Sequence, residues 1–274
     1  MNNASGNSML LYSTYLIDLD GVIYRGNELL PGAREFISWL ETNHKKYLFL
    51  TNNSFSTATQ ILAKLERLGI TSDHAHLLTA GQAAVQNIAR RLPQGVVYVV
   101  GEQPLIDLVE SNGLKAASID AQEADAVLVG LDRDFDYAVM TCAMNAVRSG
   151  ALFVTINRDP VLPIAGAFIP GCGALAAAIE VASGVTPEVV GKPEPMLLQE
   201  AMRMLSSQPG ETVMIGDGLQ VDILAGQNAG THTLLLLSGS SSKEDLEKSP
   251  IKPDHVYENL AELMKESTQS SYKP

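Results

Sequence analysis

The chain has 274 residues, of which 46% are hydrophobic and 18% charged, and its formal net charge at pH 7 is −12. This length and composition are typical of a folded chain and exclude disorder as the default. The acidic balance argues against general binding to nucleic acids or anionic membranes, because those surfaces attract clusters of Lys and Arg that the sequence lacks.

The cellular compartment can also be predicted from the sequence. No apolar run approaches the roughly 18 residues of a membrane span. Met1 to Ser13 lacks the basic start and apolar middle of a secretion signal. The two cysteines, Cys142 and Cys172, form no disulfide framework, which fits a reducing compartment. We therefore expect a cytoplasmic protein that binds neither nucleic acid nor membrane.

Short apolar runs alternate with segments of helical period along the chain. Ala33, Phe36, Ile37 and Leu40, for example, share one helical face. The alternation is typical of βαβ units, and it predicts an α/β fold with a parallel sheet. In chain order, the predicted strands are 16–18, 47–50, 96–100, 126–129, 153–156, 189–190, 213–215 and 233–237.

Polar residues follow four of these predicted strands. In open α/β sheets, ligands bind beyond the carboxyl ends of the strands. The carboxylates, hydroxyl, amides and lysine found there are the groups that phosphoryl transfer requires. The four segments are Asp18-Leu19-Asp20, Thr51-Asn52-Asn53, Gly191-Lys192-Pro193 and Gly216-Asp217-Gly218.

Asp18 and Asp20 are predicted to carry the chemistry. Side chains two residues apart in a strand project the same way, so these carboxylates repel each other unless a hard divalent metal intervenes. Asp18 can act as a nucleophile and form an aspartyl-phosphate. Asp20 can protonate the leaving alkoxide and then take a proton from the attacking water.

A magnesium site is predicted beside this pair. The expected ligands of Mg²⁺ are Asp18, Asp217 and the backbone carbonyl of Asp20, and the bound ion would let an anionic nucleophile approach an anionic phosphate. Lys192 would neutralise charge on the nucleophile and the phosphate. Asp222 is either a further group of the metal shell or an orienting partner of Lys192. An aspartate in a first helical turn is also favourable without any function.

A phosphate-binding loop is predicted around the second strand end. The Thr51 hydroxyl, Asn52, Asn53 and backbone N–H groups near Asp20 and Gly21 would bind phosphoryl oxygens. The structural alternative is that Thr51 and Asn52 simply cap the loop before the next helix.

Together these segments resemble a known family. Asp18-x-Asp20-Gly21, Thr51-Asn52-Asn53, Gly191-Lys192-Pro193 and Gly216-Asp217-x4-Asp222 resemble motifs I to IV of the haloacid dehalogenase (HAD) superfamily. The insertion between motifs II and III resembles the type C2 cap of subfamily IIA, the NagD-like and p-nitrophenyl phosphatase-like proteins. Many relatives carry threonine where this sequence has Val221, which leaves no hydroxyl contact there.

The resemblance implies a Rossmann-like core of residues 1–78 and 185–274, with an inserted α/β cap of residues 79–184 over the active site. Such a cap excludes water and selects the substrate. Asn157 and Arg158 in the cap are candidates for substrate binding, because a guanidinium can grip a second anionic group. A surface salt bridge of Arg158 is equally consistent with the sequence. Caps of this kind often mediate homodimers in the family.

We therefore expect a Mg²⁺-dependent phosphomonoesterase acting on a small metabolite phosphate. The candidate substrates are a sugar phosphate, a nucleoside monophosphate, phosphoglycolate and pyridoxal phosphate. One alternative is a catalytically weak sensor that binds a phosphorylated ligand. A haloacid dehalogenase is disfavoured, because related dehalogenases need no metal and keep no aspartate at the position of Asp20.

Overall fold

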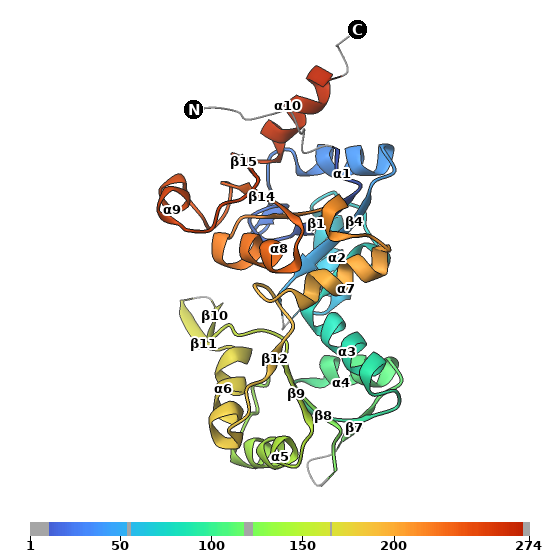
Figure 1. Ribbon diagram of the computed structural model, residues 1–274, viewed down its shortest axis with the longest axis vertical. Coiled ribbons are helices and arrows are strands. Elements are labelled where there is room, and N and C mark those ends of the chain that lie inside the picture. Colours follow the sequence, from blue (N-terminus) through green and yellow to red (C-terminus); the bar gives the residue numbers. More distant parts are fainter. Residues whose placement is uncertain (1–10, 54–55, 118–122, 165, 271–274) are drawn as a thin grey trace. The chain divides into compact units, whose positions relative to one another are not determined.

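A computed structural model describes residues 11–53, 56–117, 123–164 and 166–270 (Figure 1). Residues 1–10, which contribute to the secretion-signal expectation, lie outside this part of the chain. The described residues of 1–51, 58–78 and 192–274 form one compact unit. Those of 52–57 and 79–191 form a second. We call them unit 1 and unit 2.

Unit 1 is built on a six-stranded sheet. Strand β1 pairs in parallel with β13 and with β4, and β14 pairs in parallel with β13 and β15. The predicted α/β class with a parallel sheet is therefore confirmed. The strand order is β15 (His255–Tyr257), β14 (His232–Leu236), β13 (Thr212–Gly216), β1 (Thr14–Asp18), β4 (Lys46–Thr51) and β5 (Leu77–Thr79).

Helices cover both faces of this sheet. On one face, alternate strand residues such as Tyr15 and Ile17 join a core cluster with Phe36 of helix α1, as period-two alternation requires. Helices α1 (Ala33–Thr42), α2 (Ala58–Arg67) and α10 (Leu260–Ser270) contribute to that cluster. Leu16 points the other way, and helix α7 (Met196–Leu205) contacts β1 and β4 there. The predicted apolar face of α1 is buried as expected.

The remaining elements of unit 1 are short. A hairpin of β2 (Tyr24–Arg25) and β3 (Glu28–Leu29) follows β1. A single π-helical turn, Leu219–Ile223, precedes helix α8 (Leu224–Ala229), and helix α9 (Lys243–Lys248) follows β14. Short 3-10 turns lie at His74–His76 and Pro209–Glu211.

Unit 2 has its own five-stranded sheet. All its neighbouring strands are parallel. Helix α3 packs against α4, and α5 packs against α6. The strand order is β12 (Glu188–Val189), β9 (Leu152–Thr155), β8 (Ala126–Val129), β6 (Val96–Val100) and β7 (Lys115–Ala117). The helices are α3 (Ala80–Arg91), α4 (Gln103–Ser111), α5 (Tyr137–Arg148) and α6 (Cys172–Ser183), and β10 (Val161–Ile164) with β11 (Ala167–Pro170) forms an antiparallel hairpin.

The compact units differ from the predicted boundaries at two places. The described residues of 52–57 and residues 185–191 belong to unit 2, whereas the sequence assigned both segments to the core. For residues 185–191 the reason is strand pairing, because Glu188 and Val189 pair with Val154 and Thr155 of β9. Lys192 therefore follows an edge strand of the second sheet, and not a strand of the sheet that carries Asp18.

Among the described residues, no helix combines the length and the apolar character that crossing a membrane requires.

Candidate active site

The topology of unit 1 gathers polar groups at one edge of its sheet. Strand β1 lies between β13 and β4. Asp18 is the last residue of β1, Thr51 is the last of β4, and Asp217 comes directly after β13. Because neighbouring parallel strands end at the same edge, these three side chains are neighbours. Leu50 pairs with Asp18, which places Thr51 one residue beyond it.

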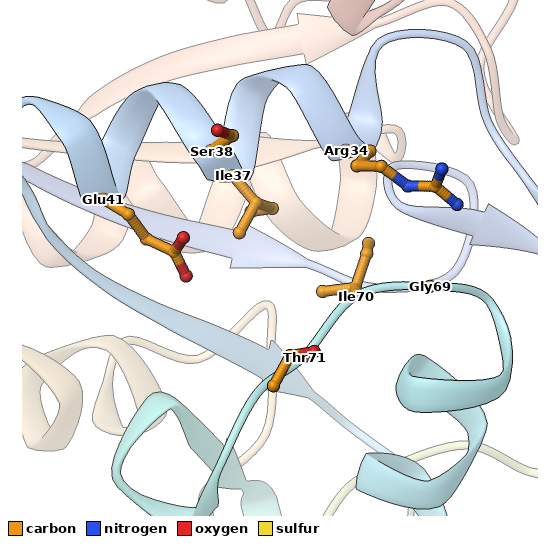
Figure 2. Close-up of a pocket in the computed structure, with 7 residues that line it drawn as sticks. All are labelled: Arg34, Ile37, Ser38, Glu41, Gly69, Ile70 and Thr71. Carbon is orange, nitrogen blue, oxygen red and sulfur yellow. The ribbon is translucent and has the colours of Figure 1, made fainter.

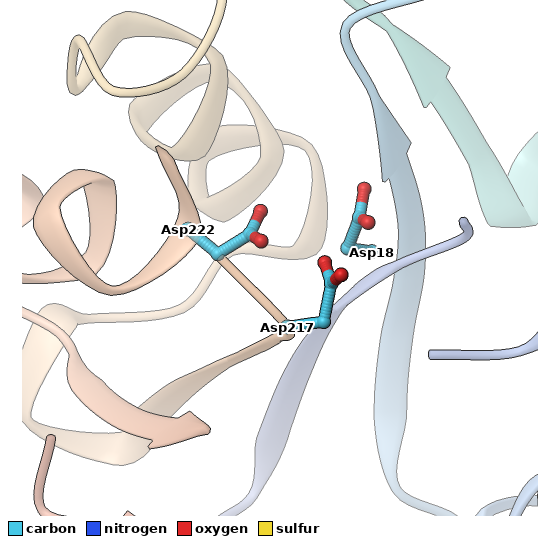
Figure 3. A group of neighbouring side chains, drawn as sticks. All are labelled: Asp18, Asp217 and Asp222. Atoms are coloured by element: carbon cyan, nitrogen blue, oxygen red, sulfur yellow. The ribbon is translucent and has the colours of Figure 1, made fainter. Parts of the chain in front are cut away.

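Three carboxylates converge at this edge. Asp18, Asp217 and Asp222 each offer one oxygen, and these oxygens all lie within 4.8 Å of one another. Figure 3 shows the three carboxyl groups turned toward one another. All three residues are at most 9% exposed. Clustered carboxylate oxygens are the donors that hard divalent cations prefer, so this site fits such an ion.

Lys192 supplies a cation within this cluster. Its Nζ donates to Asp18 Oδ1 over 2.6 Å and to Asp222 Oδ1 over 2.7 Å, and its side chain is only 2% exposed. Burial favours the neutral amine, but the two carboxylates outweigh it and raise the pKa of Lys192. The lysine therefore stays charged, and it orients both partners.

One lysine does not balance three carboxylates. Burial raises the pKa of Asp18 to about 7 despite the opposing effect of Lys192. Burial, followed by the charge of Asp222, raises the pKa of Asp217. Burial is the first cause of both shifts, and the neighbouring carboxylates add to it. A divalent cation would offset the repulsion among these carboxylates.

Residues that the sequence reasoning missed hold Asp217 in place. The Ser240 N–H donates to Asp217 Oδ2 over 2.5 Å, and the Ser241 N–H donates to the Asp217 carbonyl over 3.1 Å. A Cβ on Gly239, or on Gly21 with its positive φ of 80°, would collide with the Asp217 carboxylate. The sequence does contain a signal for these residues: Ser238-Gly239-Ser240 directly follows the predicted strand 233–237, so a fifth predicted strand is also followed by polar residues.

Asp222 is held from two sides. Its Oδ1 accepts from Lys192, and its Oδ2 accepts from the Gly218 N–H over 3.0 Å. The π-helical turn that contains it packs against β13. Both carboxylate oxygens therefore have donors from the protein.

Asp20 lies outside the cluster, and the residue as a whole is exposed. The protein around its carboxyl group nevertheless shields that group in part from water, and this desolvation raises the pKa of Asp20, while the charge of Lys64 lowers it. Its backbone forms an isolated bridge with that of Tyr24.

Four of the predicted site residues belong to unit 2: Asn52, Asn53, Asn157 and Arg158. Asn157 is 1% exposed; its Nδ2 donates to the Asn52 carbonyl over 3.0 Å, and its Oδ1 accepts from the Asp159 N–H over 3.0 Å. Asn53 Oδ1 accepts from the Ser56 N–H over 2.7 Å. The amides of Asn157 and Asn53 therefore order the backbone of unit 2.

Arg158 forms the surface salt bridge that the sequence left open. Its Nη1 lies 2.5 Å from Glu180 Oε2, and its side chain is 40% exposed. A substrate anion would have to compete with Glu180 for this guanidinium.

A separate pocket of about 180 Å³ lies between α1 and the loop after α2 (Figure 2). Arg34, Glu41 and Ile70 are among the residues that line it, and no member of the carboxylate cluster is. The Arg34 guanidinium donates to the Leu68 carbonyl over 3.2 Å. The carboxylate cluster and this pocket are therefore separate features of unit 1.

The cluster lies at the carboxyl edge of a parallel sheet, where α/β proteins bind their ligands, and it combines carboxylates that fit a metal ion with one buried lysine. Comparisons with known proteins give the family. A model described as haloacid dehalogenase-like hydrolase matches residues 15–115, and a HAD-hydrolase-like model matches residues 189–263. The chain belongs to the HAD-like hydrolases.

Two relatives match almost the whole chain. It is 38% identical to the 5'-nucleotidase YutF of Bacillus subtilis over 254 residues, which cover 93% of this chain and 98% of the relative. It is 35% identical to the acid sugar phosphatase of Staphylococcus saprophyticus over 255 residues, with the same two coverages.

Solved structures show the same similarity. NagD from Escherichia coli K-12 matches with a TM-score of 0.84 and 33% identity, over 92% of this chain and 98% of that one. A mutant of the thermostable p-nitrophenylphosphatase from Bacillus stearothermophilus matches with a TM-score of 0.83 and 37% identity, over 91% and 97%. The predicted resemblance to this family is confirmed.

Proposed function

We propose that this protein is a Mg²⁺-dependent phosphomonoesterase that hydrolyses a small metabolite phosphate through an aspartyl-phosphate. The observation that carries the proposal is the cluster of Asp18, Asp217 and Asp222 around Lys192. The names of the relatives, a 5'-nucleotidase and an acid sugar phosphatase, support phosphate ester hydrolysis. They differ in the substrate they name, so sugar phosphates and nucleoside monophosphates are both candidates, beside phosphoglycolate and pyridoxal phosphate.

Asp18 is the proposed nucleophile and Asp20 the proposed acid and base. A carboxylate oxygen of Asp18 forms a bond to phosphorus as the bond to the ester oxygen breaks, and Asp20 gives that oxygen its proton. Asp20 then removes a proton from water, which attacks the phosphorus and frees Asp18 and inorganic phosphate. The buried position of Asp18 and the exposed position of Asp20 suit these two roles.

Lys192 holds the nucleophile through its 2.6 Å bond to Asp18 Oδ1 and lowers the cost of bringing a phosphate dianion beside a carboxylate. Asp222 accepts from Lys192 and from Gly218, which favours the role of orienting partner. Asp18, Asp217 and the Asp20 carbonyl would hold Mg²⁺, and Asp222 would not ligate the ion directly. When bound, the ion would neutralise charge on the transferring phosphoryl group.

The remaining proposed contacts are to phosphoryl oxygens. Thr51, at the end of β4, has a hydroxyl beside the Asp18 strand end. Gly21 and the motif residues Asn52 and Asn53 would add donors from their backbone N–H groups. For Asn53 this role fits the structure better than a side-chain contact, because its Oδ1 already bonds Ser56.

We further propose that unit 2 acts as the cap and sets the choice of substrate, and that it provides a homodimer contact. Arg158→Ala is expected to change the ranking of substrates while leaving the rate on p-nitrophenyl phosphate within about twofold, because a small aryl ester has no second anion to grip. The measurement is kcat/KM across a panel of phosphate esters. Arg91→Ala is the matched control, because the Arg91 side chain is also 40% exposed and its Nη1 lies 2.5 Å from Glu188 Oε2. An unchanged ranking would remove Arg158 from substrate binding.

The metal-free protein is expected to lose stability as pH rises from about 4 to about 7. The pKa of Asp18 is raised to about 7 in the folded chain, so the folded state binds more protons than the unfolded state in this window, and the stability present at low pH is lost as Asp18 ionises. Mg²⁺ should therefore raise Tm more at pH 7.5 than at pH 5. Thermal unfolding with MgCl₂, against NaCl of equal ionic strength, measures this. Equal shifts at both pH values would contradict the assignment of the metal site.

The proposed function is tested by phosphate release from a panel of phosphomonoesters, including p-nitrophenyl phosphate. Release should require Mg²⁺ and stop with EDTA, and the panel then ranks the substrate classes. A folded protein that releases phosphate from none of them would favour the phosphometabolite sensor. A chloroacetate assay run alongside would detect carbon–halogen hydrolysis.

A further inference from the structure

The turn after β1 brings Asp20 against Tyr24. The Gly21 N–H donates to the Tyr24 carbonyl over 2.8 Å, and the Tyr24 N–H donates to the Leu19 carbonyl over 3.2 Å. The backbones of Asp20 and Tyr24 form a bridge. The Tyr24 hydroxyl is hydrogen-bonded to the Asp20 carboxylate. Tyr24 is 3% exposed, so a buried phenol holds an exposed carboxylate.

A lysine holds the phenol in turn. Lys64 Nζ of helix α2 lies 3.5 Å from the centre of the Tyr24 ring, which is close contact for a cation over an aromatic face. The positive charge of Lys64 also acts on Asp20. Asp20, Tyr24 and Lys64 therefore form a continuous column in unit 1, and neither Tyr24 nor Lys64 belongs to the four sequence motifs.

We propose that Tyr24 is a positioning residue for Asp20, that Lys64 locks the Tyr24 ring, and that this column keeps Asp20 aimed at the oxygen of the leaving group. The inference rests on the proposed function. An exposed aspartate has several rotamers, and only some bring its proton to the ester oxygen. A hydrogen bond to one carboxyl oxygen leaves the other to deliver the proton.

The chemistry gives this column a distinctive signature. As the Asp18 oxygen bonds to phosphorus, the ester bond breaks and its electron pair passes to the leaving oxygen. An alkoxide is strongly basic and needs the proton of Asp20 at that moment, whereas p-nitrophenolate is weakly basic and departs without it. Disordering Asp20 should therefore slow alkyl esters selectively.

The test is Tyr24→Phe, which removes only the hydroxyl, assayed with glycerol phosphate and with p-nitrophenyl phosphate. We use kcat/KM, because it reports the steps up to release of the leaving group and excludes the later attack of water. The expected result is a loss of about tenfold on the alkyl ester, a part of the 10²–10⁴-fold that acid catalysis supplies. The loss on the aryl ester should be under about twofold.

Two further variants separate positioning from folding. Lys64→Met should show the same selective loss, and Lys64→Arg should restore the rate, because arginine keeps a cation over the ring. Tyr47→Phe is the matched control: Tyr47 is also a buried tyrosine of unit 1, and its hydroxyl donates to Glu41 over 3.3 Å. It should affect neither substrate.

The outcomes are distinguishable. If the wild-type protein shows no Mg²⁺-dependent release, the proposed function fails, and the inference fails with it. If the wild type is active but Tyr24→Phe slows both esters equally, or neither, the proposed function stands and the positioning role of Tyr24 is overturned.

Discussion

Asp18→Asn is expected to lower phosphate release by at least about 10⁴-fold, because an amide can neither attack phosphorus nor form the aspartyl-phosphate. The fold should survive. The substitution removes one of three clustered carboxylates around a single lysine, so it relieves repulsion in the metal-free protein. Initial rates on the best substrate of the panel, with Tm measured alongside, check both parts.

The matched control for Asp18→Asn is Asp254→Asn. Asp254 is also in unit 1, but it accepts from the N–H and the hydroxyl of Thr233, near the amino end of β14. It should retain activity. Substantial Mg²⁺-dependent turnover in a folded Asp18→Asn variant would overturn the covalent mechanism.

Lys192→Met is expected to lower both stability and activity. It leaves Asp18 and Asp222 buried without their cation, and breaking a buried pair from one side costs about 3–5 kcal/mol. Loss of the charge that faces the phosphate should also lower kcat/KM by about 10²–10³-fold. Urea unfolding without metal and initial rates with Mg²⁺ separate the two effects.

A second substitution separates the contribution of Lys192 to stability from its contribution to activity. In the double variant Lys192→Met/Asp222→Asn, the buried charge of Asp222 is removed together with its lysine partner. Stability should therefore recover, while activity should stay low because the lysine charge is still absent. Lys46→Met is the control, because Lys46 Nζ donates to the backbone carbonyls of Leu205 and Ser206, over 2.8 and 3.0 Å, at the protein surface. Stability equal to wild type in Lys192→Met would show that the ion pairs contribute nothing to folding.

Strong local patterns made most of the fold predictable. Predicted strands 96–100 and 126–129 coincide with β6 and β8, because long apolar runs in a buried parallel sheet leave little ambiguity. Several strands of two or three residues were missed, among them β7 (Lys115–Ala117) and β15 (His255–Tyr257). The residues of β7 and β15 are partly exposed. These two strands form by pairing with a neighbouring strand, which a local hydrophobic pattern does not predict.

The site was predictable where its residues lie in short sequence motifs. Asp18, Asp217, Asp222 and Lys192 meet as expected. The partners that hold them were not predicted. Ser240 reaches Asp217 only because β14 lies beside β13, and Lys64 reaches Tyr24 through the packing of α2. Such contacts form between segments that are distant in the sequence. The spacing of residues within one segment does not predict them.

The crossing between β12 and Lys192 has a consequence for recombination between relatives. The Gly191 N–H donates to the Ile156 carbonyl over 2.8 Å, so Gly191 is anchored in unit 2, while the next residue, Lys192, pairs with Asp18 and Asp222 of unit 1. A single peptide bond therefore separates unit 2 from a lysine of the carboxylate cluster. In a chimaera that exchanges unit 2 between relatives, a junction one residue later would exchange this lysine as well, so the junction belongs between 191 and 192.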